Sequence, residues 1–86
     1  MKLSTATLLP LLAKLGTYFK MGVDHYADLR SVGAEVSPDI ICAFIQVKMS
    51  DWNPKIGGKE VLDDDTREAA ARLLAGLITN MATDRS

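Results

Sequence analysis

Residues 37–50 read SPDIICAFIQVKMS and begin with three residues that favour the start of a helix. Ser37 is a preferred N-cap, Pro38 has a backbone angle that suits the first helical position, and Asp39 complements the positive end of a helix dipole. The segment therefore predicts a helix over 38–50.

This predicted helix is apolar around most of its circumference. On a helical wheel, about two thirds of the circle is covered by apolar side chains: Ile40, Ile41, Cys42, Phe44, Ile45, Val47 and Met49. A helix of this kind lies at the centre of a core or between partners. Apolar and polar residues also alternate over 44–49, so a strand is the alternative structure for that part.

A long amphipathic helix is predicted over 7–31, where apolar residues recur on one face at helical spacing. Pro10 is tolerated in the first turn of a helix, which sets the start near Thr7. Gly22 is a common type of helix terminator, and Asp24 is a suitable cap for a second helix. We therefore expect the helix to be kinked or broken near Gly22.

The third helix is predicted over 66–82. Asp65 and Glu68 have the spacing of a capping box, and an alanine- and leucine-rich sequence with high helix propensity follows. The segment 51–64 is a long loop between the second and third helices. Within it, Gly57-Gly58 is a turn signal that can close a short hairpin.

Together these elements predict an all-α fold, a small antiparallel bundle of three to four helices formed by one helical domain over 1–86. The 86 residues are 48% hydrophobic and 24% charged, as in globular domains with a modest core. The expected core residues are Leu8, Leu12, Leu15, Phe19, Tyr26, Leu29, Ile41, Phe44, Ile45, Leu73, Leu77 and Met81.

The charge and the cysteine content restrict the classes of function. The formal net charge of −1 argues against nucleic acid as the main partner, because proteins that bind phosphates carry an excess of Lys and Arg. The single cysteine excludes an intramolecular disulfide, and no apolar run approaches the ~18 residues that span a bilayer. We expect a cytoplasmic protein.

No catalytic residue, metal site or cofactor is predicted. His25 is the only histidine, whereas zinc sites take three or four ligands. Cys42 lies in an apolar helix, where thiols are unreactive. Asp63, Asp64 and Asp65 lack the pattern of a calcium loop, and acidic residues are common at the start of a helix. Enzymatic activity is therefore the less favoured interpretation.

We predict a non-enzymatic interaction module that self-associates, as a homo-oligomer and most simply a dimer. The helix over 38–50 needs neighbours on at least two sides, and the two other helices of one chain leave part of it uncovered. A second copy supplies the missing contact through a two-fold interface. The residues predicted for self-association are Ile40, Phe44 and Val47.

The long loop is predicted to contact a protein partner other than a second copy. Its partner-binding residues are expected to be Trp52, Asn53, Lys55, Lys59 and Glu60. Tryptophan ringed by polar groups is typical of binding hot spots. The alternative is that Trp52 folds back and covers the edge of the core.

Two other functions remain as alternatives. The segment 7–19 is apolar on one side and cationic on the other, so it can lie on an anionic membrane as a peripheral anchor. The second alternative is a small enzyme or a phage-type inhibitor whose site is composed across subunits and uses His25.

Overall fold

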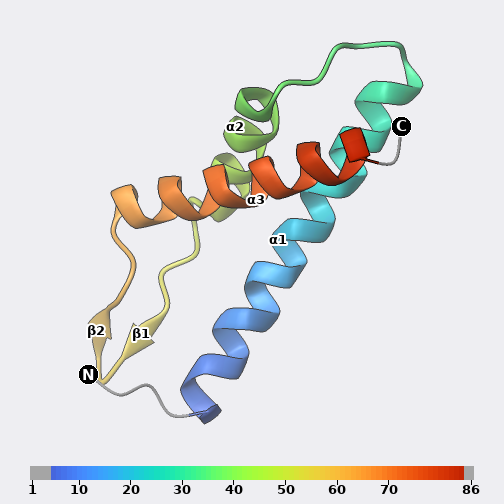
Figure 1. Ribbon diagram of the computed structural model, residues 1–86. Coiled ribbons are helices and arrows are strands. Elements are labelled where there is room, and N and C mark those ends of the chain that lie inside the picture. The colour runs from blue at the N-terminus through green and yellow to red at the C-terminus, as the bar shows by residue number, and fades with distance from the viewer. Residues whose placement is uncertain (1–4, 85–86) are drawn as a thin grey trace.

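The computed structural model describes residues 5–84 (Figure 1). Within that range the elements are α1 (Thr5–Ser31), α2 (Pro38–Met49), β1 (Lys55–Ile56), β2 (Lys59–Glu60) and α3 (Asp64–Asp84). The two strands pair antiparallel, with Lys55 opposite Glu60 and Ile56 opposite Lys59. The all-α prediction is broadly confirmed, and the hairpin foreseen at Gly57-Gly58 is the small addition to it.

α1 is one helix that continues through Gly22, so the predicted break there is wrong. It starts before Thr7, and Pro10 consequently lies inside the helix rather than in its first turn. Gly22 is buried. A Cβ atom at this position would lie 2.6 Å from Cδ1 of Ile78 and 3.0 Å from Cδ1 of Ile45. The glycine therefore serves close packing of α1 against α2 and α3, and it does not end the helix.

α2 begins as its sequence predicts. Ser37 has an extended backbone with φ of −101°, and its hydroxyl accepts a hydrogen bond from the N–H of Ile40. Pro38 occupies the first helical position. The helix ends at Met49, one residue before the predicted end, and 44–49 is helical throughout, so the strand alternative is wrong.

α3 begins at Asp64, two residues before its predicted start, and its cap is Asp63 rather than Asp65. The carboxylate of Asp63 accepts a hydrogen bond of 2.7 Å from the backbone N–H of Thr66. Hydrogen bonds from the hydroxyl and the backbone of Thr66 lower the pKa of Asp63 below its ordinary value. Three consecutive aspartates offered three possible caps, and the sequence alone did not distinguish them.

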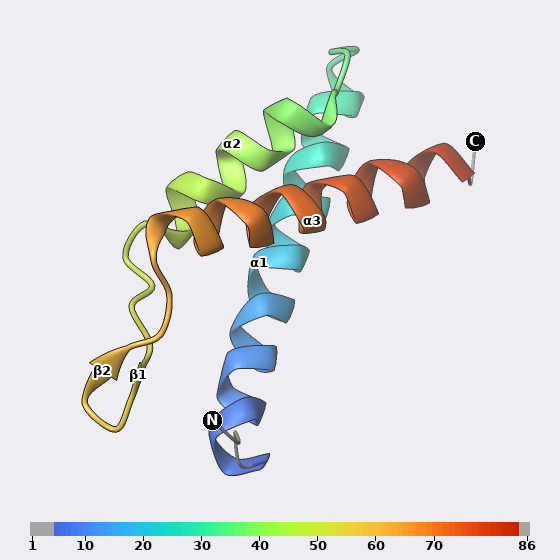
Figure 2. The same cartoon turned by 60° about the vertical axis from the view of Figure 1, so that its left-hand side comes forward.

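The three helices do not lie side by side along their lengths, so the predicted antiparallel bundle is not confirmed. α2 and α3 run in opposite directions and form the most extensive contact, whereas α1 crosses them and its first half extends away (Figures 1 and 2). The molecule measures 46 × 22 × 16 Å. Its radius of gyration is 14.3 Å, against about 12 Å for a compact chain of this length.

The core lies where the three helices meet. Its buried apolar residues are Tyr18, Ile41, Cys42, Ile45, Met49, Ala71, Ala75 and Ile78. Of the expected core residues, Ile41 and Ile45 are fully buried. Others are half-buried and packed around this cluster, namely Leu15, Phe19, Tyr26, Leu29 and Phe44. The prediction is wrong for Leu8, Leu12, Leu73, Leu77 and Met81, which are exposed.

α3 buries Ala71 and Ala75, whereas its larger Leu73 and Leu77 are exposed. Ala71 and Ala75 are fully buried, and they lie on the side of α3 that faces the core. Because Ile41, Ile45 and Met49 of α2 already fill the space between the helices, small residues on α3 give close packing without overlap. A prediction based on hydrophobicity alone therefore placed Leu73, Leu77 and Met81 in the core, although the side of α3 that carries them is exposed.

Gly22→Ala is expected to lower the free energy of unfolding by about 1 kcal/mol. Overpacking against two buried isoleucines costs about 1–3 kcal/mol, and the higher helix propensity of alanine offsets about 1 kcal/mol of this. Gly16→Ala is the control on the same helix, because a Cβ atom at Gly16 meets nothing within 4 Å. It is expected to raise stability by about 0.5–1 kcal/mol. Urea titration measures both, and changes of equal sign would contradict the close contact at Gly22.

Asp63 is expected to make the protein less stable in acid. Its folded pKa lies below the unfolded value, so its contribution is present above the unfolded pKa and is lost as the pH falls through the folded pKa. Asp63→Asn keeps an oxygen that can cap the helix but does not titrate. Melting temperatures between about pH 5 and about pH 2 should fall less steeply in Asp63→Asn than in the wild type. Thr66→Val loses only the hydroxyl donor, so the slope of its melting temperature against pH should lie between those of the other two proteins. Equal slopes in all three proteins would contradict a stabilising role of the ionised Asp63.

Candidate functional site

One side of α2 is apolar and exposed to solvent. Ile40, Ala43 and Val47, which we call the outer face of α2, follow one another at helical spacing opposite the buried Ile41 and Ile45. Ile40 is 44% exposed and Val47 is 70% exposed. The helix therefore has one apolar side in the core and a second apolar side on the surface.

Phe44, the third residue predicted for self-association, lies at the edge of this face and makes contacts within the chain. Its ring stacks on the imidazole of His25, with centroids 4.0 Å apart and planes 6° from parallel. The ammonium group of Lys48 lies 5.4 Å from the centroid of the same ring. Phe44 thus joins α2 to α1, while Ile40 and Val47 remain available to a partner.

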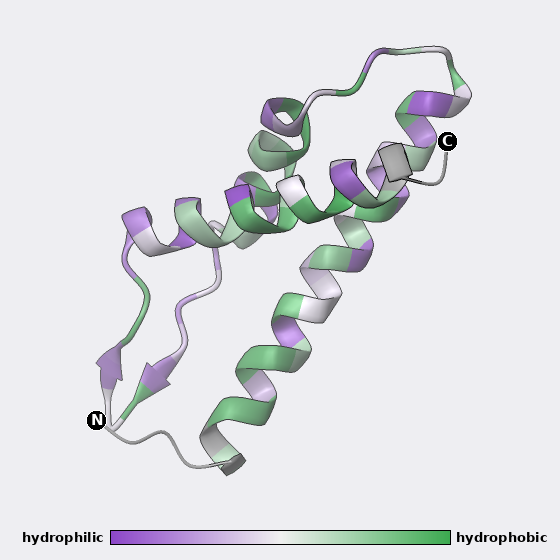
Figure 3. Ribbon diagram, viewed as in Figure 1, coloured by the Kyte–Doolittle hydropathy of each residue, from purple (hydrophilic) through white to green (hydrophobic). Residues whose placement is uncertain are grey.

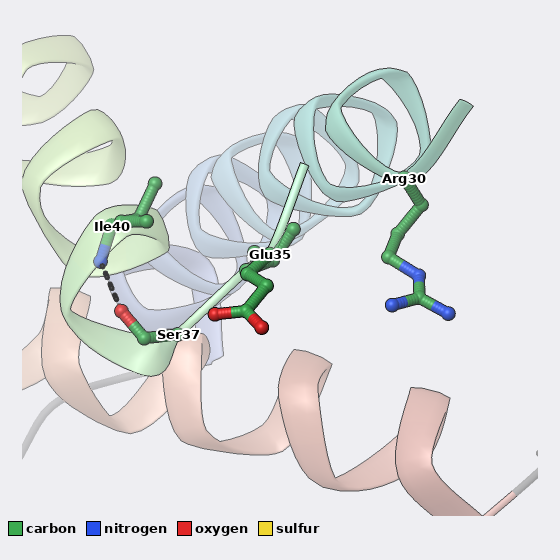
Figure 4. Close-up of a pocket in the computed structure, with 5 residues that line it drawn as sticks. Arg30, Glu35, Ser37 and Ile40 are labelled. Atoms are coloured by element: carbon green, nitrogen blue, oxygen red, sulfur yellow. Dashed lines mark hydrogen bonds between the residues drawn. The ribbon is translucent and has the colours of Figure 1, made fainter. Parts of the chain in front are cut away.

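A hollow of about 500 Å³ lies between the end of α1 and the start of α2. We call it the α1–α2 hollow, and it is lined by Arg30, Glu35, Val36, Ser37 and Ile40. In Figure 4 the carboxylate of Glu35 and the guanidinium of Arg30 both enter the open space. Neither group forms an ion pair within residues 5–84. Ile40 belongs to both the hollow and the outer face of α2, so the two are continuous.

Trp52 lies at the edge of the core. Its side chain is half-buried, and its ring centroid is 5.5 Å from that of Tyr18, with the planes tilted by 52°. Burial raises the pKa of Tyr18, and the negative charge of Asp51 adds to this effect. Trp52 therefore has the position of a residue that covers the core, and its role in partner binding stays a prediction.

Arg67 holds the loop on α3, and the sequence analysis missed it. Its side chain is only 12% exposed. Its guanidinium donates to the carbonyls of Trp52 at 3.0 Å and Leu62 at 3.2 Å, to the carboxylate of Asp64 at 2.8 Å, and to the amide oxygen of Asn53. One side chain thus joins both ends of the loop. The side chain of Asn53, a predicted partner residue, is used inside the chain.

The other predicted partner residues, Lys55, Lys59 and Glu60, are exposed on the hairpin. Gly57 and Gly58 form its turn with φ values of 63° and 81°, a left-handed conformation that glycine adopts without strain. Three of the four strand residues are charged, in contrast to the largely hydrophobic first half of α1 (Figure 3). The structure therefore separates a charged hairpin from the apolar helix faces.

The side chains that could take part in catalysis or metal binding, Cys42, Asp63 and Asp64, are engaged in packing or in hydrogen bonds. Burial raises the pKa of the Cys42 thiol, which disfavours the reactive thiolate at neutral pH. The carboxylates of Asp63 and Asp64 bind Thr66 and Arg67 at the start of α3. In the described part of the chain, no three His, Cys, Asp or Glu side chains are grouped so that they would hold a metal ion.

Two further apolar surfaces are exposed, one on α3 that the sequence analysis did not predict and one within the segment 7–19 that it considered for membrane attachment. Leu73, Leu77 and Met81 lie four residues apart on exposed positions of α3, and we call them the outer face of α3. Leu8, Leu9 and Leu12 are exposed on the first half of α1. The repeated alanines at positions 71 and 75 were the signal for the first of these surfaces, because small residues four apart mark a side of close helix contact.

Comparison of the chain with protein-family models, with curated proteins and with solved structures finds no match. None of the helices within residues 5–84 combines the length and the apolar character needed to cross a membrane.

Arg67→Lys is expected to destabilise the protein by about 1–3 kcal/mol, because lysine keeps the charge but cannot reproduce the planar set of donors. Arg72→Lys is the control on the same helix. The Arg72 side chain is 61% exposed and its ion pairs with Asp39 and Glu68 are 3.5 Å long, so a change within about 0.5 kcal/mol is expected.

Hydrogen exchange locates the effect of Arg67→Lys. The amide of Val61 bonds to the carbonyl of Pro54 across the base of the hairpin. This amide should exchange faster in Arg67→Lys than in Arg72→Lys. Equal exchange in the two variants would show that Arg67 does not hold the loop.

Proposed function

We propose that this chain is a non-enzymatic assembly module that self-associates through its exposed apolar helix faces. The observation that carries the proposal is its surface area. The chain exposes 6001 Å², whereas a compact monomer of its mass exposes about 5,000 Å². The excess of about 1,000 Å² is comparable to the roughly 800 Å² that each partner contributes to a stable protein interface.

The apolar part of this surface is arranged in lines along helices. Leu73 is 66% exposed, and it begins the outer face of α3 as Ile40 begins that of α2. Single exposed apolar residues are normal on monomers, but contiguous apolar surfaces mark interaction sites. Burial contributes about 25 cal/mol for each Å² of apolar surface removed from water, so these faces favour association.

A second copy is the occupant that we favour over a membrane. The exposed leucines of α1, Leu8, Leu9 and Leu12, are what supports peripheral attachment through 7–19. A bilayer, however, contacts one side of a protein, whereas the outer faces of α2 and α3 each lie away from the core between these helices. In addition, Lys14 and Lys20 would each add only about 1 kcal/mol at an anionic surface.

The hairpin is the surface that we propose for a different protein partner. Lys55, Lys59 and Glu60 are exposed on it, and the hydrogen bonds of Arg67 fix its base. A loop held in one conformation loses less entropy on binding than a flexible one. Trp52 would act in this interaction by anchoring the loop to the core.

Sedimentation equilibrium tests self-association. The wild type is expected to exceed its monomer mass of 9.3 kDa increasingly as its concentration rises through the micromolar range. At least one of Val47→Lys and Leu73→Lys should weaken association tenfold or more, because each places a charge on an outer face. Thr17→Lys adds the same charge on the polar side of α1 and should have no effect. A wild type that stays monomeric at several hundred micromolar would refute the proposal.

A further inference from the structure

We propose that two copies pair through their α2 helices about a two-fold axis at Ala43, with Val47 of each copy seated in the α1–α2 hollow of the other. This inference rests on the proposed self-association and adds to it the face, the orientation and the contacting residues.

The outer face of α2 is self-complementary in an antiparallel pair. Ile40 and Val47 lie three and four residues on either side of Ala43, which corresponds to about 4.5 and 6 Å along the helix. Two antiparallel helices that cross at Ala43 therefore place Ile40 of one copy opposite Val47 of the other, and this contact occurs twice. Alanine at the crossing point allows the helices to approach closely.

The shape of the surface fits the same arrangement. Val47 protrudes near the C-terminal end of α2, and the α1–α2 hollow lies at the N-terminal end beside Ile40. An antiparallel pair brings these two ends together. Val47 of one copy then contacts Ile40 and Val36, the apolar residues that line the hollow of the other copy.

The charges favour this orientation over a parallel one. Lys48 follows Val47 on the side of α2 that carries Phe44, and Glu35 lines the hollow at the opposite end. Neither has an ion-pair partner among the described residues. In Figure 4 the Glu35 carboxylate lies between Ile40 and the guanidinium of Arg30. The two-fold axis gives two such Glu35–Lys48 pairs.

The outer face of α3 is also apolar and exposed, but it has no equivalent set of features. Leu73, Leu77 and Met81 form a line of large side chains, whereas α2 combines its apolar face with an adjoining hollow and with opposite charges at its two ends. Both faces favour association, but only that of α2 specifies a register. We therefore assign the two-fold contact to α2.

Exchanging the charges of Glu35 and Lys48 in the wild-type sequence tests the antiparallel orientation of the two α2 helices. Glu35→Lys and Lys48→Glu are each expected to weaken the dimer about tenfold, because each places like charges together twice. The double variant with both changes should return to within about threefold of the wild type. Lys20→Glu makes the same charge change at an exposed position of α1 and should leave the dimer unchanged. A double variant no better than the single ones overturns the orientation.

Cross-linking tests the position of the axis. In a Cys42→Ala background, Ala43→Cys should form a covalent dimer on oxidation with diamide, because a residue on the axis meets its own copy. Val47→Cys should not, since its two copies lie about 12 Å apart along the helices and disulfides need Cα atoms within about 7 Å. Circular dichroism first confirms that each variant folds.

The outcomes separate this inference from the proposed function. If the wild type dimerises but Ala43→Cys does not cross-link, or if Leu73→Lys abolishes the dimer while Val47→Lys does not, the α2 contact is wrong and self-association stands. If the wild type is monomeric, both are wrong.

Discussion

The contact of the Gly22 backbone with Ile45 and Ile78 is the point at which all three helices meet. A side chain at this position would occupy space that the two isoleucines already fill. α1 continues as one helix on both sides of Gly22, and its first turns, which carry the exposed Leu8, Leu9 and Leu12, extend away from α2 and α3 (Figure 2). The elongated shape and the exposed leucines of α1 follow from this crossing.

The second constraint is the set of hydrogen bonds made by Arg67. The loop between α2 and α3 has little regular structure, and carbonyl groups without partners there would favour open conformations. Arg67 satisfies the carbonyls of Trp52 and Leu62, one at each end of the loop. Because the same guanidinium binds Asp64 in the first turn of α3, the position of the loop and the start of the helix are coupled. Trp52 is consequently held against the core beside Tyr18.

Local signals in the sequence predicted most of the helices and the hairpin, but they did not predict how the helices pack against one another. Ser37 and Pro38 located the start of α2 because capping acts within a few residues, and the same holds for the glycine turn of the hairpin. Gly22 was misread as a terminator because its role comes from side chains distant in the sequence. The buried side of α3 was not predicted, because it carries the small Ala71 and Ala75, which fit against the large side chains of α2. The role of Arg67 could not be predicted from a local pattern, because its partners Trp52, Asn53 and Leu62 lie in a loop without a regular structure.

The same crossing that builds the core also explains why the surface favours a partner. The first turns of α1 lie away from the cluster around Ile41 and Ile45, and α2 and α3 each turn one apolar side away from it, so a chain with many apolar residues buries few of them. α2 shows the consequence most clearly, because its two apolar sides cannot both face one small core. Burying the second side within the chain would need another helix. A two-fold contact supplies that helix from an identical copy, at no cost in chain length, and it matches Val47 to the hollow beside Ile40.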